Sequence, residues 1–189
     1  MATTRHILDA TDIDRILKRM AFEILEAHKG NHLALIGIHT RGVFLARRLQ
    51  SHMKTFEGAE VPVGEIDITL YRDDWTQLSA HPVVKKTVIP FSVDGRKIIL
   101  VDDVLFTGRT IRAAMDALID FGRPARIELA VLIDRGHREL PIQSNYTGQC
   151  LTTRRSEMVN VLLQESDDQD RVTLTGASRA EDGTPRTSR

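Results

Sequence analysis

The chain has 189 residues, and its 26 Lys and Arg side chains balance its 26 Asp and Glu side chains, so the formal charge is zero. This balance excludes binding of nucleic acid through an overall basic field, and any such binding needs a local patch. Cys150 is the only cysteine, which excludes an intrachain disulfide. Because no run of about 18 apolar residues occurs and the start lacks an apolar signal core, we expect a cytoplasmic protein without a membrane segment.

The order of the predicted elements is that of an alternating α/β protein. Residues 11–29 have the amphipathic pattern of a helix, and residues 33–38 form an apolar run typical of a buried strand. Strands that alternate with helices predict a three-layer fold, in which a mostly parallel, twisted sheet is flanked by helices. The other predicted elements are a helix over 42–52, strands over 66–71, 97–102, 126–134, 159–165 and 171–174, and a helix that begins after Arg109.

Three stretches lack a clear period. Residues 1–8 are interpreted as a lead-in, and the polar residues 73–86 as a mobile loop. Residues 176–189 are rich in Gly, Ser, Thr and Pro, which predicts a disordered tail. We therefore expect one domain over residues 1–175, followed by that tail.

The most informative stretch is Lys97–Ile111, in which an apolar strand ends in two acids and a short loop opens a helix. A helix start offers unpaired backbone N–H groups and a positive dipole end, which together bind phosphate. The Thr107 hydroxyl and a close backbone approach at Gly108 would add to such a site. Asp102 and Asp103 can accept hydrogen bonds from vicinal sugar hydroxyls, so the stretch fits a sugar phosphate. By itself, an Asp-Asp pair is more typical of a turn or a helix cap.

The loop Gly37–Gly42 also joins an apolar strand to a helix. Its GxxxxG spacing matches the first part of the phosphate-binding loop of nucleotide triphosphatases. That alternative fails because Val43 and Phe44 stand where the loop needs Lys and Ser or Thr. Ligands of parallel sheets bind beyond the carboxyl ends of the strands, so we expect His39 and Thr40 to lie beside the acid pair. Taken alone, the loop is more typical of an ordinary strand-to-helix turn.

As a whole, the string from Ile98 to Thr110 resembles the motif with which type I phosphoribosyltransferases bind phosphoribosyl diphosphate (PRPP). Together, the segments 64–74, 101–109 and 133–142 resemble the PyrR family, and the resemblance extends over residues 9–175. That family couples uracil phosphoribosyltransferase activity with binding of pyrimidine operon mRNA. The resemblance implies that the chain makes UMP and diphosphate from uracil and PRPP. It also implies a phosphoribosyltransferase fold with a small hood and a flexible loop that closes over PRPP.

The resemblance further assigns roles to single residues. It implies that Asp102 and Asp103 hold the ribose hydroxyls, and that Arg72 and Lys85 act in catalysis from the closing loop, although a charge run there is also an ordinary solvated face. Mg²⁺ would be held mainly through PRPP, with no metal site built from the protein itself. The implied PRPP-binding residues are Thr40, Arg41, Ile98, Ile99, Leu100, Val101, Asp102, Asp103, Val104, Leu105, Phe106, Thr107, Gly108, Arg109 and Thr110. The implied base-binding residues are Val104, Leu105, Ile133, Asp134, Arg135 and Val159.

For binding of leader mRNA, the resemblance implies a set of basic side chains, with an affinity tuned by UMP and other nucleotides. The set is Arg19, His137, Arg138, Arg154 and Arg155. The chain departs from the family at Phe22, where histidine is expected, and at Gln143 and Gln149, where relatives often carry basic residues. Two alternatives therefore stay open: a salvage phosphoribosyltransferase without RNA regulation, and an RNA-binding regulator with vestigial catalysis. The family also implies a homo-oligomer, either a dimer or a tetramer.

Overall fold

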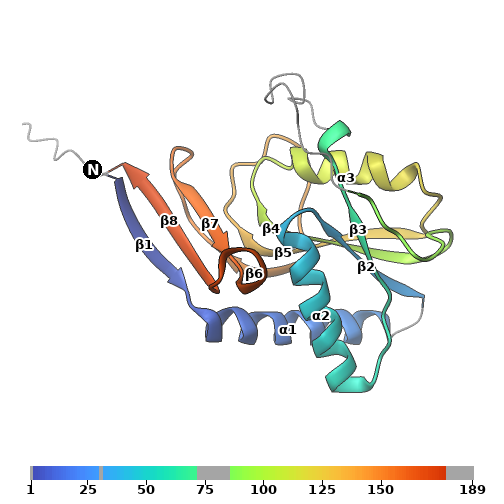
Figure 1. The fold of residues 1–189 in the computed structure, drawn as a ribbon. Coiled ribbons are helices and arrows are strands. Elements are labelled where there is room, and N and C mark those ends of the chain that lie inside the picture. The colour runs from blue at the N-terminus through green and yellow to red at the C-terminus, as the bar shows by residue number, and fades with distance from the viewer. Residues whose placement is uncertain (1, 30–31, 72–85, 178–189) are drawn as a thin grey trace, which may run out of the picture.

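The computed structural model describes residues 2–29, 32–71 and 86–177. Five strands form a central sheet, three strands form a second sheet, and the helices pack around them, which confirms the predicted α/β class (Figure 1). The elements are β1 (Ala2–Leu8), α1 (Ala10–His28), β2 (Leu33–Ile38), α2 (Arg41–Glu57), β3 (Val63–Ile66), η1 (Thr69–Tyr71), β4 (Lys97–Leu105), α3 (Arg109–Ile119), β5 (Arg126–Asp134), β6 (Tyr146–Cys150), β7 (Met158–Leu162), α4 (Gln164–Asp167) and β8 (Arg171–Ala177).

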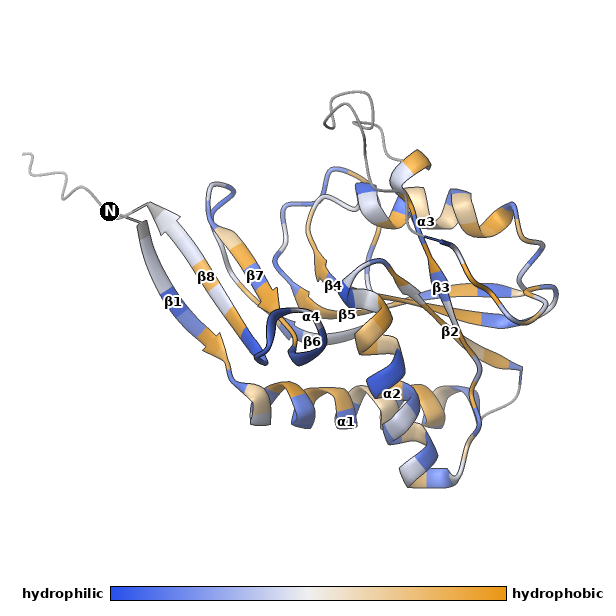
Figure 2. Cartoon of the chain, viewed as in Figure 1, coloured by the Kyte–Doolittle hydropathy of each residue, from blue (hydrophilic) through white to orange (hydrophobic). Residues whose placement is uncertain are grey.

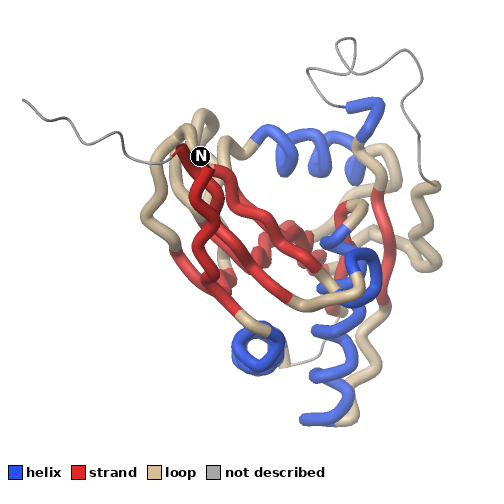
Figure 3. The backbone as a smooth tube through the Cα atoms, turned by 60° about the vertical axis from the view of Figure 1, so that its left-hand side comes forward, coloured by secondary structure: helices blue, strands red, loops and turns tan. Residues whose placement is uncertain are grey.

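The central sheet has the strand order β3-β2-β4-β5-β6, and every neighbouring pair is parallel. Side chains alternate between the two faces of a strand. In β4, Ile99 and Val101 pack with residues of α1 and α2, whereas Ile98 and Leu100 pack with residues of α3. The sheet is therefore the middle of three layers, with α1 and α2 on one face and α3 on the other (Figure 1, Figure 3).

The helix predicted over 11–29 is α1, and its start is fixed by a capping box. The Asp12 N–H donates to Asp9 Oδ1 at 2.9 Å, and the Asp9 N–H donates to Asp12 Oδ2 at 3.3 Å. Figure 2 shows that α1 carries both apolar and polar residues around its turns, as a helix covering one face of a sheet must. None of the helices in the described ranges is long and apolar enough to cross a membrane.

A second, smaller sheet stands beside the first one and is the predicted hood. Its strand order is β1-β8-β7, and both pairs are antiparallel. The interpretation of residues 1–8 as a lead-in is wrong, because residues 2–8 form β1 and pair with β8 from Ala2↔Ala177 to Leu8↔Val172. The partner strand lies at the other end of the chain, so no local sequence pattern points to the pairing.

Two further predictions on strands are corrected, and one strand was missed. The strand predicted over 66–71 is placed too late, since β3 spans Val63–Ile66. It ends there because Asp67 Oδ1 accepts hydrogen bonds from the Thr69 N–H at 2.9 Å and from the Thr69 hydroxyl at 2.6 Å. This Asx turn bends the chain into the short helix η1. The predicted strand 159–165 is the shorter β7, followed by α4. β6 was not predicted, because its sequence is neither alternating nor continuously apolar.

The boundary of the predicted tail also changes. Gly176 and Ala177 belong to β8, so a tail that begins at residue 176 begins too early. Residues 178–189 lie outside the described residues, as do Arg72, Lys85 and all of the predicted loop except Lys86.

A buried polar cluster joins the end of α1 to the beginnings of β5 and β6. The Tyr146 hydroxyl donates to Glu128 Oε2 at 2.9 Å, and the same oxygen lies 2.8 Å from His28 Nε2. Although burial opposes the change, these hydrogen bonds lower the pKa of Glu128. Burial and the bond to Glu128 raise the pKa of Tyr146 well above its ordinary value. The cluster ties the helix to the sheet at the amino ends of the strands.

Candidate functional site

A polar pocket lies at the carboxyl ends of β2 and β4, which are neighbours in the parallel sheet. Because parallel strands end at the same edge, the loop after β2 and the acid pair at the end of β4 meet there. The pocket has a volume of about 300 Å³. It is lined by His39, Thr40, Arg41, Asp67, Ile68, Thr69, Asp102, Asp103, Val104 and Thr110.

The acid pair is held in a buried position. Asp102 is 7% exposed, and its Oδ1 accepts a hydrogen bond from the Asp103 N–H at 2.9 Å. Asp103 Oδ1 in turn accepts from the Val104 N–H at 2.8 Å. Burial, followed by the neighbouring Asp103 charge, raises the pKa of Asp102 well above its ordinary value. Burial also raises the pKa of Asp103, although Arg41 opposes it.

Two glycines explain why the loop after β2 carries the GxxxxG spacing. A Cβ on Gly42 would lie 2.2 Å from the Val101 carbonyl oxygen and 3.2 Å from Asp102 Cα. A Cβ on Gly37 would lie 2.4 Å from Val43 Cα. The distances of 2.2 and 2.4 Å are far below van der Waals contact, so only glycine lets the first turn of α2 pack on the ends of β2 and β4. The loop therefore lies against the acid pair because these two side chains are absent.

The predicted phosphate loop runs from the end of β4 into α3. Gly108 has a φ of 92°, a left-handed conformation that favours glycine, and it stands at the N-cap of α3. The Thr107 hydroxyl accepts from the Arg109 N–H at 3.4 Å. The first N–H groups of any helix lack partners within that helix, so the start of α3 presents donors beside Thr110, a residue of the pocket.

Arg138 braces this loop from the segment after β5. Its guanidinium donates to the Phe106 carbonyl at 2.9 Å and to the Ile142 carbonyl at 3.0 Å, and it forms an ion pair with Asp134. Backbone bonds from Glu139 and Leu140 to the Thr107 carbonyl, at 2.9 and 3.2 Å, tie the two segments together. The segment 134–142 thus supports the loop between β4 and α3.

The residues predicted to bind PRPP and the base do not all reach the pocket. Ile98, Ile99, Leu100 and Val101 are at most 1% exposed, and their side chains form the core on both faces of β4, so these side chains position the site. The predicted base-binding residues Leu105, Ile133 and Val159 are buried too, at 1, 0 and 9% exposure. Among the predicted base-binding residues, Val104 is the one that lines the pocket.

Asp134 and Arg135, the other two residues predicted at the base, are held by neighbours. Arg135 is 6% exposed, its guanidinium lies 4.1 Å from the Phe106 ring centroid, and it donates to the Arg154 carbonyl at 3.0 Å. Asp134 accepts from the Gly136 N–H at 2.9 Å as well as pairing with Arg138. These contacts give both side chains a supporting role in the segment after β5.

The basic residues predicted to bind RNA fall into two groups. His137 and Arg138 follow β5, and His137 Nε2 lies 2.8 Å from the Thr153 carbonyl in the loop that carries Arg154 and Arg155. Arg19 lies on α1 and donates to the carbonyls of Thr147 and Gly148 in β6, at 3.0 and 2.6 Å. Because Arg138 is directed into the protein, it is less available to an outside ligand than the exposed Arg154.

Several residues of the site were not predicted. Asp67, Ile68 and Thr69 line the pocket, and the Asp-x-Thr pattern of an Asx turn was the available signal. Asp167 on α4 forms an ion pair with Arg41 at 2.9 Å. Nothing in the sequence indicates this pair, since its members are 126 residues apart.

Comparisons with known proteins agree with this geometry. The family described as "Phosphoribosyl transferase domain" matches residues 3–168. The chain is 56% identical to "Bifunctional protein PyrR" of Elusimicrobium minutum over 169 residues, which cover 89% of this chain and 94% of that one. It is 57% identical to the protein of the same name from Thermus thermophilus, with 89% and 93% covered.

Solved structures show the same fold at low sequence identity. The hypoxanthine phosphoribosyl transferase of Trypanosoma cruzi has a TM-score of 0.70 at 18% identity and covers 92% of this chain and 91% of its own. The hypoxanthine phosphoribosyltransferase of Staphylococcus aureus has a TM-score of 0.66 at 17% identity, with 94% and 93% covered. These likenesses confirm the predicted type I phosphoribosyltransferase fold.

Proposed function

This chain belongs to the PyrR family of phosphoribosyl transferase domain proteins, and we propose that it transfers the phosphoribosyl group of PRPP to uracil at the pocket between β2 and β4. The observation that carries the assignment is the buried acid pair beside the α3 N-terminus and the Arg41 loop. The pocket brings sugar-hydroxyl acceptors and two loops that open helices together at one edge of the sheet.

Each part of PRPP has a complementary group. Asp102 and Asp103 accept hydrogen bonds from the two ribose hydroxyls, and Asp103 does more of this because it is the more exposed of the two. The N–H groups that open α3, with Thr107 and Thr110, bind the 5′-phosphate. Thr40 and Arg41 bind the diphosphate, for which the guanidinium supplies charge-assisted hydrogen bonds. The base lies near Val104.

The transfer needs no covalent bond to the protein. Uracil N1 forms a bond to ribose C1′, the bond from C1′ to the diphosphate oxygen breaks with its electrons going to diphosphate, and the N1 proton is released. Positive charge builds on the ribose and negative charge on the leaving group. The carboxylates at the ribose and Arg41 at the diphosphate stabilise these charges, and the two loops hold PRPP in place for the attack.

Phosphoribosyltransferases generally take PRPP together with Mg²⁺, and the donor set of this pocket fits that arrangement. No group of three His, Cys, Asp or Glu side chains that could hold a metal occurs within the residues that the structure describes. A cation with few protein ligands that keeps its waters and takes substrate oxygens is typical for Mg²⁺. When bound with PRPP, it would neutralise charge on the diphosphate, and Asp102 and Asp103 are the carboxyl groups within reach of the ribose.

The second activity is regulation through pyrimidine operon leader mRNA, bound by a local basic patch and tuned by UMP and other nucleotides. The exposed Arg154 and Arg155, with the nearby His137, supply that patch, and Arg19 on α1 is a separate basic contact. Such a patch suits an RNA loop or bulge better than a long duplex. The protein acts in the cytoplasm as a homo-oligomer. An enzyme without RNA regulation is the alternative that the departures at Phe22, Gln143 and Gln149 leave open.

The enzymatic assignment is tested with Asp103→Asn, which keeps the shape of the side chain and removes its charge. We expect turnover of uracil and PRPP to UMP to fall about 100-fold, because charge stabilisation of this kind has that typical magnitude. Asp116→Asn is the matched control, since Asp116 is a half-exposed α3 residue outside the pocket. Turnover of Asp103→Asn near that of the control would refute the role. A panel of uracil, guanine, hypoxanthine and orotate tests the choice of base.

The regulatory assignment is tested by a gel shift with pyrimidine leader RNA, with and without UMP. We expect binding that responds to UMP and weakens with salt, because each neutralised phosphate of a single strand releases about 0.7 counterions. Arg154→Ala should weaken binding, whereas Arg123→Ala, an exposed arginine beyond α3, should not. If no UMP-dependent binding of the RNA is found, the protein is an ordinary salvage enzyme.

A further inference from the structure

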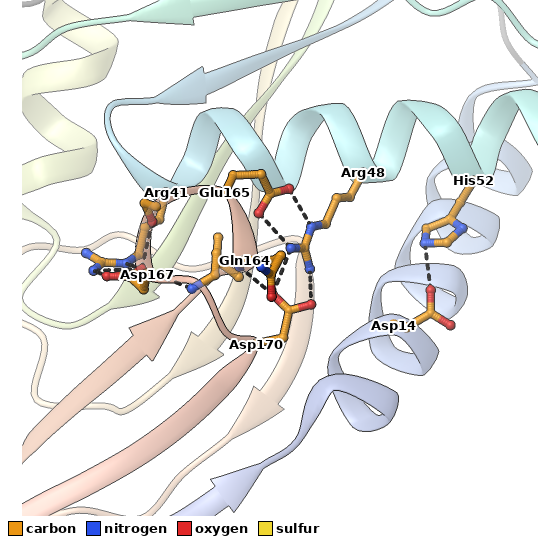
Figure 4. A network of polar contacts seen from close by, with 10 residues as sticks. Asp14, Arg41, Arg48, His52, Gln164, Glu165, Asp167 and Asp170 are labelled. Atoms are coloured by element: carbon orange, nitrogen blue, oxygen red, sulfur yellow. Dashed lines mark hydrogen bonds and ion pairs between the residues drawn. The ribbon is translucent and has the colours of Figure 1, made fainter.

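Two arginines of α2 reach across to the turn between β7 and β8, and acidic residues of that turn receive both (Figure 4). Arg41, at the first turn of α2, pairs with Asp167. Arg48, about two turns further along, pairs with Glu165 and Asp170. Within this turn, the residues of α4 are polar (Figure 2). These ion pairs are the polar link between the hood and the helix that opens at the pocket.

The pair of Arg41 and Asp167 uses one edge of the guanidinium. Arg41 Nη2 donates to Asp167 Oδ1 at 2.9 Å and to Oδ2 at 3.2 Å, and Nε donates to Oδ2 at 3.3 Å. The other terminal nitrogen, Nη1, takes no part in these three bonds. Arg41 also lines the pocket and is 33% exposed, so its guanidinium lies between the hood and the site.

Asp167 is itself held in place by its own turn. Its Oδ2 accepts from the Leu163 N–H at 3.0 Å and from the Ser166 hydroxyl at 2.7 Å. These bonds, followed by the bond to Arg41, lower the pKa of Asp167 to about 2. The carboxylate is therefore charged at any pH at which the protein works, and it is a fixed anchor for a long side chain that would otherwise sample many rotamers.

We propose that Asp167 is a positioning residue for the transfer reaction: anchored in the hood, it holds the Arg41 guanidinium at the pocket so that the free edge meets the diphosphate of PRPP. This inference rests on the proposed function, because it concerns the residue that binds the diphosphate there. Asp167 does not touch PRPP. The ion pair with Asp167 reduces the rotamer freedom that Arg41 must lose when the substrate binds. It also keeps the guanidinium next to the loop after β2.

The chain contains a matched control for this role. Asp170 lies in the same turn, its side chain is 18% exposed against 20% for Asp167, and it too accepts from an arginine of α2 and from a backbone N–H, that of Gln164 at 2.8 Å. Its partner Arg48 is not among the residues that line the pocket. Asp170→Asn therefore weakens a hood-to-α2 ion pair of the same kind, although Arg48 keeps its pair with Glu165, and it leaves the Arg41–Asp167 pair intact.

The experiment measures KM for PRPP, KM for uracil and kcat for the full chain and for Asp167→Asn, Asp167→Glu and Asp170→Asn, with thermal unfolding of each. For Asp167→Asn we expect KM for PRPP to rise about tenfold, the usual effect of losing a charged hydrogen-bond partner, with KM for uracil changed less than twofold. Asp167→Glu should recover most of the loss. Asp170→Asn should have the same KM for PRPP as the unmutated protein.

Each other outcome overturns the inference in a recognisable way. Equal KM values for PRPP in Asp167→Asn and Asp170→Asn would mean that the Arg41–Asp167 ion pair only attaches the hood to α2. A fall in KM for PRPP would mean that Asp167 withholds Arg41 from the substrate instead of presenting it. If the full chain itself shows no PRPP-dependent turnover, the proposed function fails and not only this inference. Binding of inorganic diphosphate, measured by calorimetry, gives the same comparison without turnover.

Discussion

The close packing at Gly42 allows a sharp test of how the site is built. Gly42→Ala adds one carbon atom, which would lie 2.2 Å from the Val101 carbonyl oxygen, whereas ordinary contact begins at 3.4 Å. The atoms that the new Cβ would meet are backbone atoms of β4, so no side chain can rotate out of the way. Either the first turn of α2 or the end of β4 must move by about 1 Å, and overpacking of this kind costs about 3 kcal/mol.

For a chain of this length, that cost lowers Tm by about 6–12 °C. The control is Gly58→Ala at the other end of α2, where a Cβ meets nothing within 4 Å and only the left-handed φ of 64° is strained. That strain costs about 1 kcal/mol, and the expected fall in Tm is about 2–4 °C. Because the new Cβ of Gly42→Ala also approaches Asp102 Cα, affinity for PRPP should fall in this variant and stay unchanged in the control.

Scanning calorimetry and urea unfolding give the stabilities, and titration calorimetry with PRPP and Mg²⁺ gives the affinity. If both variants unfold at the same temperature, α2 is not pressed against β4 and the explanation of the glycine spacing is wrong. If Gly42→Ala is strongly destabilised yet binds PRPP as the full chain does, the loop after β2 does not depend on this contact for its position.

Three other predictions follow from the described contacts. Arg138→Ala should lower the free energy of unfolding in urea by about 2 kcal/mol and raise KM for PRPP, because it removes hydrogen bonds that support the phosphate loop. The control is Arg155→Ala, which should lower the free energy of unfolding by less than about 1 kcal/mol, because the Arg155 side chain is 64% exposed. Burial raises the pKa of Asp102, so its contribution to stability is present below the unfolded carboxyl pKa of about 3.9 and is lost as pH rises through the higher folded value. Asp102→Asn should therefore flatten the dependence of Tm on pH above pH 4, and an unchanged slope would contradict the raised pKa. Glu128→Gln should lower the free energy of unfolding by about 2 kcal/mol through its buried hydrogen bonds while leaving KM for PRPP unchanged, since Glu128 lies at the amino end of β5; a shift in that KM would contradict the separation of the two ends.

The central layers of the fold follow from local patterns in the sequence. The apolar runs at 33–38, 97–102 and 126–134 coincide with strands β2, β4 and β5, and the period of 11–29 coincides with α1. These segments are buried on both faces or along one stripe, so their composition reports their surroundings directly. The hood is different, because its strands are only partly buried and their pairing joins segments near the two ends of the chain.

The sequence by itself also determined the chemistry of the site. Two adjacent acids, a loop that opens a helix and a glycine-spaced loop are contiguous motifs, and parallel strands bring such loops to one edge whatever the details of packing. Side-chain roles were harder to predict, because the same residue type serves as core, brace or ligand. The Ile98–Val101 run proved to be core, and Arg138 proved to point inward.

Only the tertiary structure decided which distant groups meet. Asp167 reaches Arg41 because the turn at α4 lies beside the start of α2, and Asp67 lines the pocket because an Asx turn ends β3 early. A local pattern reflects the interactions of a residue with its chain neighbours and with solvent, which is why it predicts helices, strands and loops. Contacts between residues more than a hundred positions apart depend on how those elements pack, and packing is a property of the whole folded chain.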